Sequence, residues 1–361
     1  MQANPKTRLL RTISVAKIAR KTISTTTDSA RVVEQDCLAL LQSCGGLSEL
    51  TRLHAHILKS GLHNNRLVLT KFASTSSLLN AIDYAYCYLF SPEADSSHYD
   101  TFLFNTIIRA YAQSSEAKFK AIFLYNFMLG CGLLPNKYTY PFVLKACAGI
   151  GKLNLGKSVH GSVLKFGFDD DVHVLNTMVH MYCCCDSGIG FARNVFDEMP
   201  KLDSVSWSVM IGGYVRLRQS IEAVELFRRM QMESVCPDEI TVVLVVSAST
   251  DLGALELGKW VESFIEKQRV RKSVELRNAL IDMYAKCGDV DRALKLFRAM
   301  NERTIVSWTS VIVGLAMHGR GLEAVSLFEE MIGEGVEPDD VAFYWYVTLS
   351  YVVGIVVEVM N

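Results

Sequence analysis

Two stretches of this chain, residues 204–238 and 305–339, repeat one another at a separation of 101 residues. In each, apolar residues recur at intervals of three and four, the spacing of one helical face. A second apolar stripe follows, and each copy ends in Pro-Asp, where a helix cannot readily continue. Each stretch is therefore predicted to form a hairpin of two helices, roughly 35 residues long. The first stripes comprise Trp207, Met210, Ile211 and Tyr214, and Trp308, Val311, Ile312 and Leu315.

Weaker matches extend the pattern along the chain. Residues 181–199 match 283–300 and indicate a shorter hairpin, and residues 153–157 match 255–259 and indicate a third type. A single hairpin cannot bury its own apolar face, so repeats of this period predict an all-α solenoid in which neighbours stack. The predicted repeats span residues 34–65, 66–100, 101–136, 137–171, 172–203, 204–238, 239–273, 274–304 and 305–339.

Composition is compatible with this array. The chain has 361 residues, of which 50% are hydrophobic and 21% are charged, so by length alone it could also hold two or three globular domains. The repeats favour a single array. Ten cysteines without regular spacing do not form a disulfide framework, and we expect reduced thiols.

Residues 1–33 differ from the rest, with seven basic residues against one acid and a Ser/Thr-rich run. This composition predicts a disordered organellar transit peptide, the alternative being a disordered basic tail. Without it, residues 34–361 carry 30 basic against 37 acidic residues, a formal net charge of −7. Bulk attraction to a polyanion is thereby excluded, and nucleic-acid binding would need a local basic stripe and specific hydrogen bonds.

Residues 340–361 are predicted to be a truncated repeat that continues into an apolar tail. The segment begins as a long repeat should, but its helical stripe is lost after Phe343. We expect a repeat cut short by unrelated sequence, as mis-splicing or read-through would produce. A membrane anchor is the alternative, against which Glu358 and the lack of a basic flank argue.

Several of these stretches together resemble plant pentatricopeptide repeat (PPR) proteins of the PLS subclass, whose repeats alternate in length. The resemblance covers about residues 34–343 and implies a right-handed superhelical α-solenoid of about nine helix-turn-helix repeats. Tetratricopeptide repeats, which usually bind proteins, are the alternative, but their Trp-x2-Leu-Gly signature is missing and their period does not alternate. The matching stretches are residues 140–161, 204–214, 238–248 and 278–297, and Val-x-Pro-Asp at 235–238 and 336–339.

The resemblance implies that each hairpin recognises one RNA base through the fifth residue of its first helix and the last residue of the repeat. An amide at the fifth position offers a donor and an acceptor to a pyrimidine, whereas a hydroxyl suits a purine. The implied RNA-binding pairs are Thr70 with Asp100, Asn105 with Asn136, Asn176 with Asp203, Ser208 with Asp238, Asn278 with Thr304, and Thr309 with Asp339.

In the long repeats the fifth residues are Pro141 and Val243, whose side chains cannot hydrogen-bond a base, so these repeats are expected to be near-neutral spacers. The implied order along a parallel RNA strand is G, pyrimidine, any, U, G, any, pyrimidine, G. The pair Asn278 with Thr304 departs from the family pattern, in which an acid or amide usually ends the repeat. Each polar residue could instead be a helix-start residue satisfied by its own backbone, but six pairs in register favour recognition.

Aromatic residues on the apolar stripes are expected to be core residues rather than platforms for stacking bases. They are Trp207, Trp308, Tyr182 and Tyr284. By analogy with the family, the second residues Phe102, Val205 and Val306 are better candidates for sandwiching a base.

No enzyme, metal or cofactor is expected. The related editing proteins end in a deaminase-like DYW domain with His-x-Glu and paired Cys-x-x-Cys, and neither pattern occurs in this sequence. Cys183, Cys184 and Cys185 are consecutive, so on a helix they point in different directions and are expected to be small core residues, not a zinc site.

The resemblance implies single-stranded organellar RNA as the partner, in the mitochondrion or chloroplast with the mitochondrion preferred. The expected role is site recognition for C-to-U RNA editing, with the deaminase supplied in trans by a deaminase-bearing PPR protein together with multiple organellar RNA editing factors. The alternatives are RNA stabilisation, splicing or cleavage without catalysis, and a protein-binding helical scaffold. No small-molecule substrate and no membrane association are expected.

Overall fold

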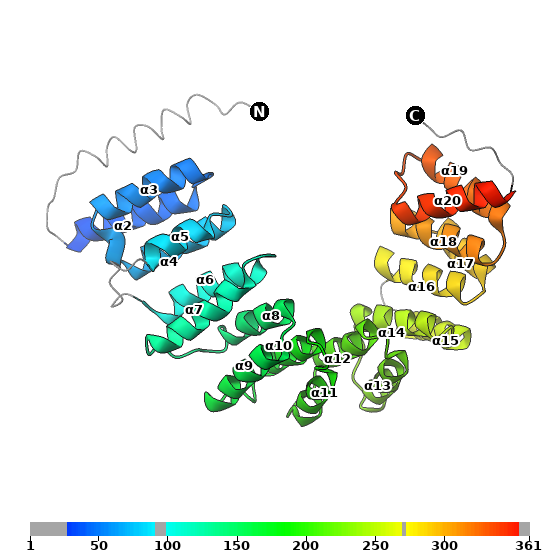
Figure 1. Ribbon diagram of the computed structural model, residues 1–361, viewed down its shortest axis with the longest axis horizontal. Helices are drawn as coiled ribbons and strands as arrows, with labels where there is room; N and C mark the ends of the chain where they lie inside the picture. Colours follow the sequence, from blue (N-terminus) through cyan, green and yellow to red (C-terminus); the bar gives the residue numbers. More distant parts are fainter. Residues whose placement is uncertain (1–26, 91–98, 269–271, 354–361) are drawn as a thin grey trace. The chain divides into compact units, whose positions relative to one another are not determined.

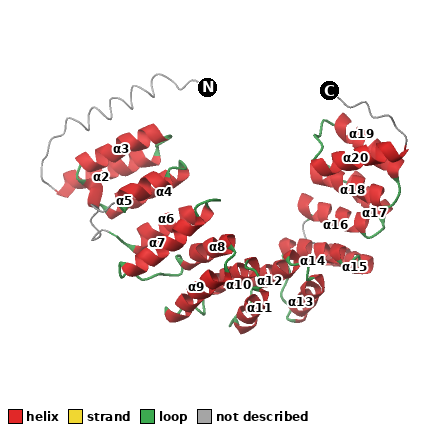
Figure 2. Cartoon of the chain, viewed as in Figure 1, coloured by secondary structure: helices red, strands yellow, loops and turns green. Residues whose placement is uncertain are grey.

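The computed structural model describes residues 27–90, 99–268 and 272–353, and within these ranges every regular element is a helix (Figure 2). The helices pair into successive hairpins (Figure 1). The chain divides into two compact units, residues 1–146 and residues 147–361. The all-helical solenoid predicted from the repeats is confirmed.

In the first unit, α2 packs on α3 and α4, α4 packs on α5 and α6, and α6 packs on α7. α2 and α4 thus each contact both the second helix of their own hairpin and the first helix of the next. The elements are α2 (Thr27–Gln42), α3 (Leu47–Lys59), the 3-10 turn η1 (Leu62–Asn64), α4 (Arg66–Leu78), α5 (Ile82–Leu89), α6 (Thr101–Gln113) and α7 (Lys118–Gly130), and the division between the units falls within α8 (Tyr140–Ile150).

The second unit repeats this scheme. Its first helices α10, α12, α14, α16, α18 and α20 pack each on the next, and each from α10 to α18 also packs on the second helix of its own hairpin. The elements are α9 (Leu153–Lys165), α10 (Val172–Cys184), α11 (Ile189–Glu198), α12 (Ser204–Arg216), α13 (Ser220–Met232), α14 (Glu239–Asp251), α15 (Leu255–Gln268), α16 (Val274–Lys286), α17 (Val290–Arg298), α18 (Ile305–Met317), α19 (Gly321–Gly333) and α20 (Asp340–Val353).

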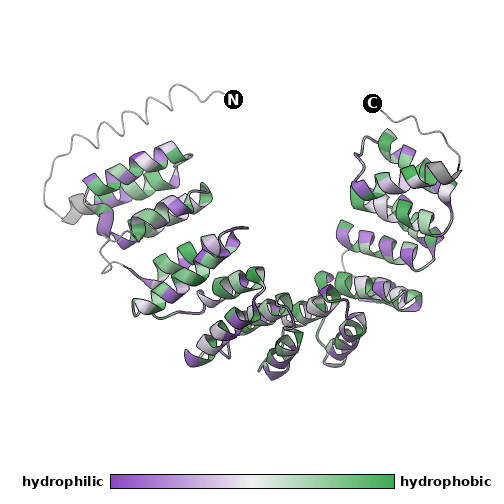
Figure 3. Cartoon of the chain, viewed as in Figure 1, coloured by the Kyte–Doolittle hydropathy of each residue, from purple (hydrophilic) through white to green (hydrophobic). Residues whose placement is uncertain are grey.

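Hydrophobic and hydrophilic residues alternate along most helices (Figure 3), and the hydrophobic ones fill the space between neighbouring helices. The aromatic residues expected in the core are buried there. Trp207 packs edge-on against Phe196 with ring centroids 5.1 Å apart, and Trp308 packs in the same way against Phe297 at 4.7 Å. Tyr182 and Tyr284 are also buried, so the core assignment is confirmed for all four residues.

First helices begin where the predicted repeats begin, at residues 66, 101, 172, 204, 239, 274 and 305. Two starts differ. The hairpin expected from residue 137 has its first helix from Tyr140, because Pro141 lacks the N–H that a helix begun earlier would use and disfavours helical geometry just before it. The first hairpin starts at Thr27 rather than residue 34, since α2 extends into the segment that composition had set apart.

The rest of that segment, residues 1–26, lies outside the described residues, and so does the end of the tail from residue 354. Residues 340–353 form α20, so the helix continues past Phe343 although the apolar stripe does not. α20 packs on α18 and α19, where Ala342 is fully buried and Tyr346 stacks on Phe328 with ring centroids 4.1 Å apart. Neighbouring apolar surface holds this helix even though its own stripe is weak. Among the described residues, no helix combines the length and apolarity needed to span a bilayer.

Candidate nucleic-acid interface

The structure brings five of the six predicted pairs into direct side-chain contact. In each, a side-chain N–H or O–H group of the fifth residue lies within hydrogen-bond distance of the last residue of the same repeat, 26 to 31 residues further along the chain. The donor–acceptor distances are 3.1 Å for Asn105 with Asn136, 3.2 Å for Asn176 with Asp203, 3.2 Å for Ser208 with Asp238, 3.1 Å for Asn278 with Thr304, and 3.1 Å for Thr309 with Asp339. The Ser208 hydroxyl lies closer still to Ser204 O, at 2.9 Å, and to Thr241 Oγ1, at 2.6 Å.

The sixth pair is different. Thr70 donates to the backbone carbonyl of Arg66 in its own helix at 2.8 Å, as a helical hydroxyl with no other use often does. Asp100, its predicted partner, accepts from the Leu103 N–H at 2.8 Å and caps α6. No hydrogen bond joins Thr70 to Asp100 in the described part of the chain.

At most junctions the last residue of a repeat is also the N-cap of the next first helix, the exception being Asn136, which precedes a turn before α8. Asp203, for example, accepts from the Ser206 N–H at 2.8 Å and from the Ser206 hydroxyl at 2.9 Å, which satisfies a backbone donor that the helix leaves open. Burial raises the pKa of the Asp203 carboxyl, but these hydrogen bonds and the one from Asn176 outweigh burial and hold the pKa below its usual value. Asp203 is therefore an ionised carboxylate at neutral pH, and its negative charge lies beside the side-chain amide of Asn176.

The fifth residues are more covered than their predicted role suggested. Asn105, Asn176 and Ser208 expose only 8%, 6% and 8% of their surface, while Asn278 and Thr309 are half-buried. Most of their polar atoms are paired within the chain. One exception is Asn176 Oδ1, which is buried and has no hydrogen-bond partner among the described residues. Such an acceptor typically costs about 1–3 kcal/mol of stability unless a donor reaches it.

Apolar side chains flank these pairs in the open. The second residues Phe102, Val205 and Val306, expected to sandwich a base, are 66%, 51% and 52% exposed. Large apolar residues normally point away from solvent, so their repeated exposure at one position of the repeat is unusual. Further exposed second residues were not predicted, although the same position in the repeat would have found them: Leu67, Tyr138, Ile240 and Val341.

The long repeats lack a polar fifth residue, as expected. Pro141 is buried and Val243 is half-buried. Their last residues still cap helices, since Asp171 accepts from the Val174 N–H at 3.1 Å and Ser273 accepts from the Leu276 N–H at 3.2 Å.

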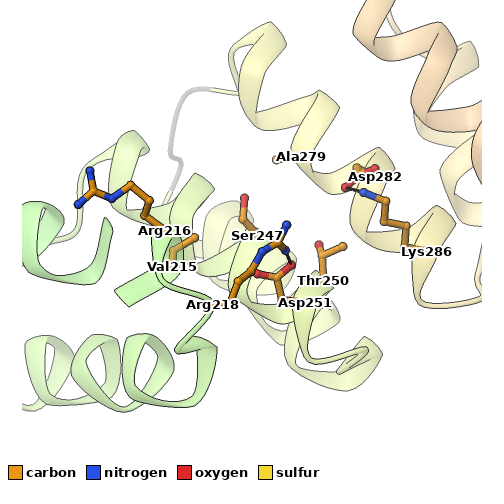
Figure 4. Close-up of a pocket in the computed structure, with 9 residues that line it drawn as sticks. All are labelled: Val215, Arg216, Arg218, Ser247, Thr250, Asp251, Ala279, Asp282 and Lys286. Carbon is orange, nitrogen blue, oxygen red and sulfur yellow. Dashed lines mark hydrogen bonds and ion pairs between the residues drawn. The ribbon is translucent and has the colours of Figure 1, made fainter. Parts of the chain in front are cut away.

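A hollow of about 360 Å³ lies between the first helices α12, α14 and α16 (Figure 4). Arg216, Arg218 and Lys286 bring positive charge to its lining. Arg218 is ion-paired with Asp251, and the Lys286 ammonium lies 2.9 Å from Asp282. The lining of the hollow therefore carries both positive and negative charge. Arg216 lies on α12, the helix of Ser208, and Lys286 lies on α16, the helix of Asn278.

The three consecutive cysteines have different surroundings. Cys183 and Cys185 are buried, as expected, but the expectation is wrong for Cys184, which is half-exposed and accepts from the Arg216 guanidinium at 2.9 Å. His180 lies 3.7 Å from the same sulfur, one helical turn back. Burial raises the pKa of the Cys184 thiol, but hydrogen bonds from His180 and Arg216 outweigh burial and lower it. The described residues contain no group of three His, Cys, Asp or Glu that could hold a metal ion.

Comparison with known proteins supports the repeat assignment. A family model described as a PPR repeat family matches residues 303–344, and one described as a PPR repeat matches residues 205–235 and 277–305. The pentatricopeptide repeat-containing protein At5g56310 of Arabidopsis thaliana is 36% identical over 82% of this chain and 62% of its own length. The pentatricopeptide repeat-containing protein At1g59720, chloroplastic/mitochondrial, of the same plant is 39% identical over 86% of this chain and 49% of its own length.

Solved structures of the same kind have the same fold. The crystal structure of the pentatricopeptide repeat protein PPR10 in complex with an 18-nt psaJ RNA element superposes with a TM-score of 0.68 at 17% identity, over 87% of this chain and 47% of that one. PPR10 from maize superposes with a TM-score of 0.66 at 16% identity, over 89% and 46%. This chain thus spans about half of each protein's length, and at most 62% of the two Arabidopsis relatives. It is a pentatricopeptide repeat protein related to these Arabidopsis proteins.

Proposed function

We propose that this protein binds single-stranded RNA in a sequence-specific manner, with the polar fifth residue and the last residue of each ordinary or short repeat recognising one base. The observation that carries the proposal is the hydrogen-bonded pairing of five of these residue couples, each at the start of a first helix. Capping alone needs only the last residue. A fifth residue that is largely covered would be less costly as an apolar side chain, because a buried polar group must find partners.

The exposed second residues support the same proposal. A base that enters between two neighbouring repeats meets one apolar side chain on each side, such as Val205 and Ile240 beside Ser208. Contact with both faces of the base adds binding energy that is independent of its identity. Hydrogen bonds to the fifth and last residues then select among bases.

The role in the organelle is the finer part of the proposal. We assign the protein to site recognition for C-to-U RNA editing in the mitochondrion or chloroplast, with the deaminase in trans, and propose no catalysis by the described residues. Support comes from a relative whose name places it in the chloroplast or mitochondrion. First helices that start at residues 172, 204, 239, 274 and 305 are also unequally spaced, with two long intervals between two shorter ones, and unequal repeat lengths are typical of the PLS subclass.

Base recognition is tested by Asn176→Thr. Asn176 with Asp203 is expected to prefer U, and a hydroxyl at this position, as in the pair Thr309 with Asp339, should move the preference toward G. We would measure binding to a panel of RNA oligonucleotides that differ only at the fourth nucleotide of the predicted order. Thr177→Ala is the matched control, because the neighbouring Thr177 hydroxyl bonds its own helix at His173 O and should not contribute to base selection. A preference unchanged by Asn176→Thr would contradict base recognition by this pair.

Two further measurements separate the functions. Gel-shift assays with the predicted RNA in rising salt should retain sequence preference if bases are recognised, whereas a protein-binding scaffold would show no such preference. Sequencing organelle RNA from plants that lack the protein should reveal lost C-to-U sites. Intact editing with altered transcript ends, abundance or splicing would instead indicate a stabilisation, cleavage or splicing factor.

A further inference from the structure

A third polar side chain lies at the junctions between repeats. In three first helices, and in the turn before α8, the third residue after the last residue of a repeat is serine or threonine. Its hydroxyl is within hydrogen-bond reach of the fifth or the last residue of that repeat. At most 1% of these side chains is exposed, so their hydroxyl protons must be donated within the protein. The four are Thr139, Ser206, Thr241 and Ser307. We call them the third-residue hydroxyls.

Where the N-cap is neutral, this hydroxyl donates to the fifth residue. Ser307 Oγ lies 2.6 Å from the carbonyl oxygen of Asn278, while the Asn278 amide nitrogen donates to the N-cap Thr304 at 3.1 Å. The Asn278 side chain is thereby hydrogen-bonded through both its amide nitrogen and its Oδ1 atom, so Oδ1 already has a donor within the protein.

The same arrangement recurs in the turn before α8, where the neutral Asn136 accepts from the Thr139 N–H as an N-cap does. Thr139 Oγ1 lies 2.8 Å from Asn105 Oδ1 and farther, at 3.2 Å, from Asn136. The amide nitrogen of Asn105 donates to Asn136 at 3.1 Å. The carbonyl oxygen of this fifth residue is engaged as well.

Where the N-cap is aspartate, the hydroxyl turns to the carboxylate instead. Ser206 Oγ donates to Asp203 at 2.9 Å, and Thr241 Oγ1 donates to Asp238 at 2.7 Å. Thr241 Oγ1 also lies 2.6 Å from the hydroxyl of the fifth residue Ser208, which can donate to it. A hydroxyl has one proton, and a charged acceptor forms the stronger hydrogen bond. Asn176 Oδ1, at the junction with Asp203, consequently has no donor among the described residues and is the acceptor left unpaired.

We infer that the third-residue hydroxyl is a specificity-determining positioning residue, which engages the carbonyl oxygen of a fifth-position asparagine when the N-cap is neutral and leaves it open when the N-cap is aspartate. The inference rests on the proposed function. It concerns residues outside the pairs of fifth and last residues, and it assigns them an effect on base choice without contact with RNA.

The chemistry of pyrimidines gives the expected direction. An asparagine with an open carbonyl accepts from the N3–H of uracil. When the carbonyl is engaged, only the amide N–H remains to offer, which suits the N3 acceptor of cytosine. The Asn176 position should therefore favour uracil, and the Asn278 and Asn105 positions should favour cytosine.

The test is Ser307→Ala in the full chain. It removes the proton that engages Asn278 Oδ1, so the ratio of the Kd values for cytosine and uracil at the seventh nucleotide of the predicted order should shift toward uracil. One net hydrogen bond corresponds to a shift of roughly three- to tenfold. Binding would be measured by fluorescence anisotropy with short RNA oligonucleotides that carry each pyrimidine at that nucleotide. Ser307→Thr, which retains a hydroxyl, should keep the original preference.

Ser206→Ala is the matched control. Ser206 and Ser307 each accept from the backbone N–H of their N-cap, at 3.2 and 3.1 Å, so both variants lose the same capping bond. Only Ser307→Ala frees a carbonyl oxygen, since Ser206 donates to a carboxylate. Ser206→Ala should therefore leave the uracil preference at the fourth nucleotide unchanged.

A second variant guards against failure to fold. Thr139→Val keeps the shape of the side chain and removes its hydroxyl, and it should shift the second nucleotide from cytosine toward uracil. If Asn278→Ala changes the preference at the seventh nucleotide but neither Ser307→Ala nor Thr139→Val has an effect at its own position, the inference is wrong while base recognition stands. If no variant, Asn278→Ala included, alters any preference, the proposed function fails with it.

Discussion

At the scale of single residues, buried histidine makes stability depend on pH. His160 is half-buried against Tyr182, with Nδ1 2.9 Å from the tyrosine hydroxyl, and burial lowers its pKa although Glu198 acts weakly in the opposite direction. The unfolded chain, where histidine has a pKa of about 6.5, then binds more protons than the folded chain as the solution becomes acidic. Stability contributed by neutral His160 is complete above this pH and is lost as the pH falls through the lowered folded value.

His160→Gln should reduce that dependence, because glutamine retains a polar partner for Tyr182 but does not titrate. We expect the melting temperature to fall less between pH 7.5 and pH 5 in the variant than in the wild type. Thermal unfolding followed by circular dichroism at a series of pH values checks this. Parallel curves for the two proteins would show that His160 does not carry the effect.

Cys184 should be the most reactive of its three neighbouring thiols. The thiolate is the nucleophile, and Arg216 together with His180 lowers the Cys184 pKa, whereas burial raises the pKa of Cys183 to about 12. Of these three thiols, iodoacetamide should modify Cys184 first. Arg216→Gln should slow the modification of Cys184 roughly several-fold at pH 7.5. Peptide mass spectrometry over time gives the rates. Lys286→Gln removes a cation that does not contact Cys184, and an equal slowing in that control would refute the assignment to Arg216.

At the scale of the helix, two adjacent glycines in α12 illustrate how closely first helices approach. A Cβ on Gly213 would overlap Cys183 Sγ and come within 3.0 Å of Cys183 Cβ on α10. A Cβ on Gly212 would meet only the flexible end of Leu244, at 3.3 Å. Alanine favours the helix at both positions by about 1 kcal/mol, so the difference between the variants reports the packing.

We predict that overpacking in Gly213→Ala lowers the free energy of unfolding by about 1–3 kcal/mol. The higher helix propensity of alanine offsets part of this loss. Gly212→Ala, one residue away, should be neutral or slightly stabilising. Urea denaturation of both variants tests this. Equal stability would mean that α10 shifts away at little cost.

Most helix starts could be predicted because each one follows a residue that both ends a repeat and caps a helix, such as Asp203 or Asp238. The start at Tyr140 was missed because the repeat pattern does not take into account that Pro141 lacks the backbone N–H that a helix begun at residue 137 would use. The continuation of α20 past Phe343 was not indicated by the sequence, because this helix packs on α18 and α19 although its own apolar stripe is weak.

The candidate site divides along similar lines. The fifth and last residues were paired through the resemblance to the PPR family, and the repeat register served only to place those positions in this sequence. Ser307 could not be connected to Asn278 from the sequence, because serine three residues after Thr304 suggests only a local capping box. Its contact with Asn278, 29 residues earlier, depends on how two first helices pack.

At the scale of the whole molecule, net charge opposes binding to RNA, because residues 34–361 carry a formal charge of −7. Any interaction with phosphates must come from a few positions where cations gather. The hollow between α12, α14 and α16 is one, with Lys286 partly offset by Asp282 and Arg218 by Asp251. Binding should therefore depend on salt only moderately for a nucleic-acid-binding protein.

Lys286→Ala should weaken binding to all RNA sequences by the same factor and leave base preferences intact. Removing one ion pair between the protein and a phosphate of a single strand reduces the slope of log K against log salt concentration by about 0.7. Anisotropy titrations at several KCl concentrations provide both quantities, and Lys259→Ala on the second helix α15 is the control. A change in base preference in Lys286→Ala would contradict a role limited to phosphate.

Helix capping by the last residue of most repeats would restrict how a protein with the proposed function can change its target. If the last residue also recognises a base, as proposed, a substitution there would alter two properties at once: the nucleotide preferred by one hairpin and the folding of the next. Only side chains able to cap, chiefly Asp, Asn, Ser and Thr, are tolerated at low cost. The repertoire of targets open to this chain by single mutations is thus limited by the stability of its helix starts as much as by RNA chemistry, and retargeting by design should begin at the fifth residue.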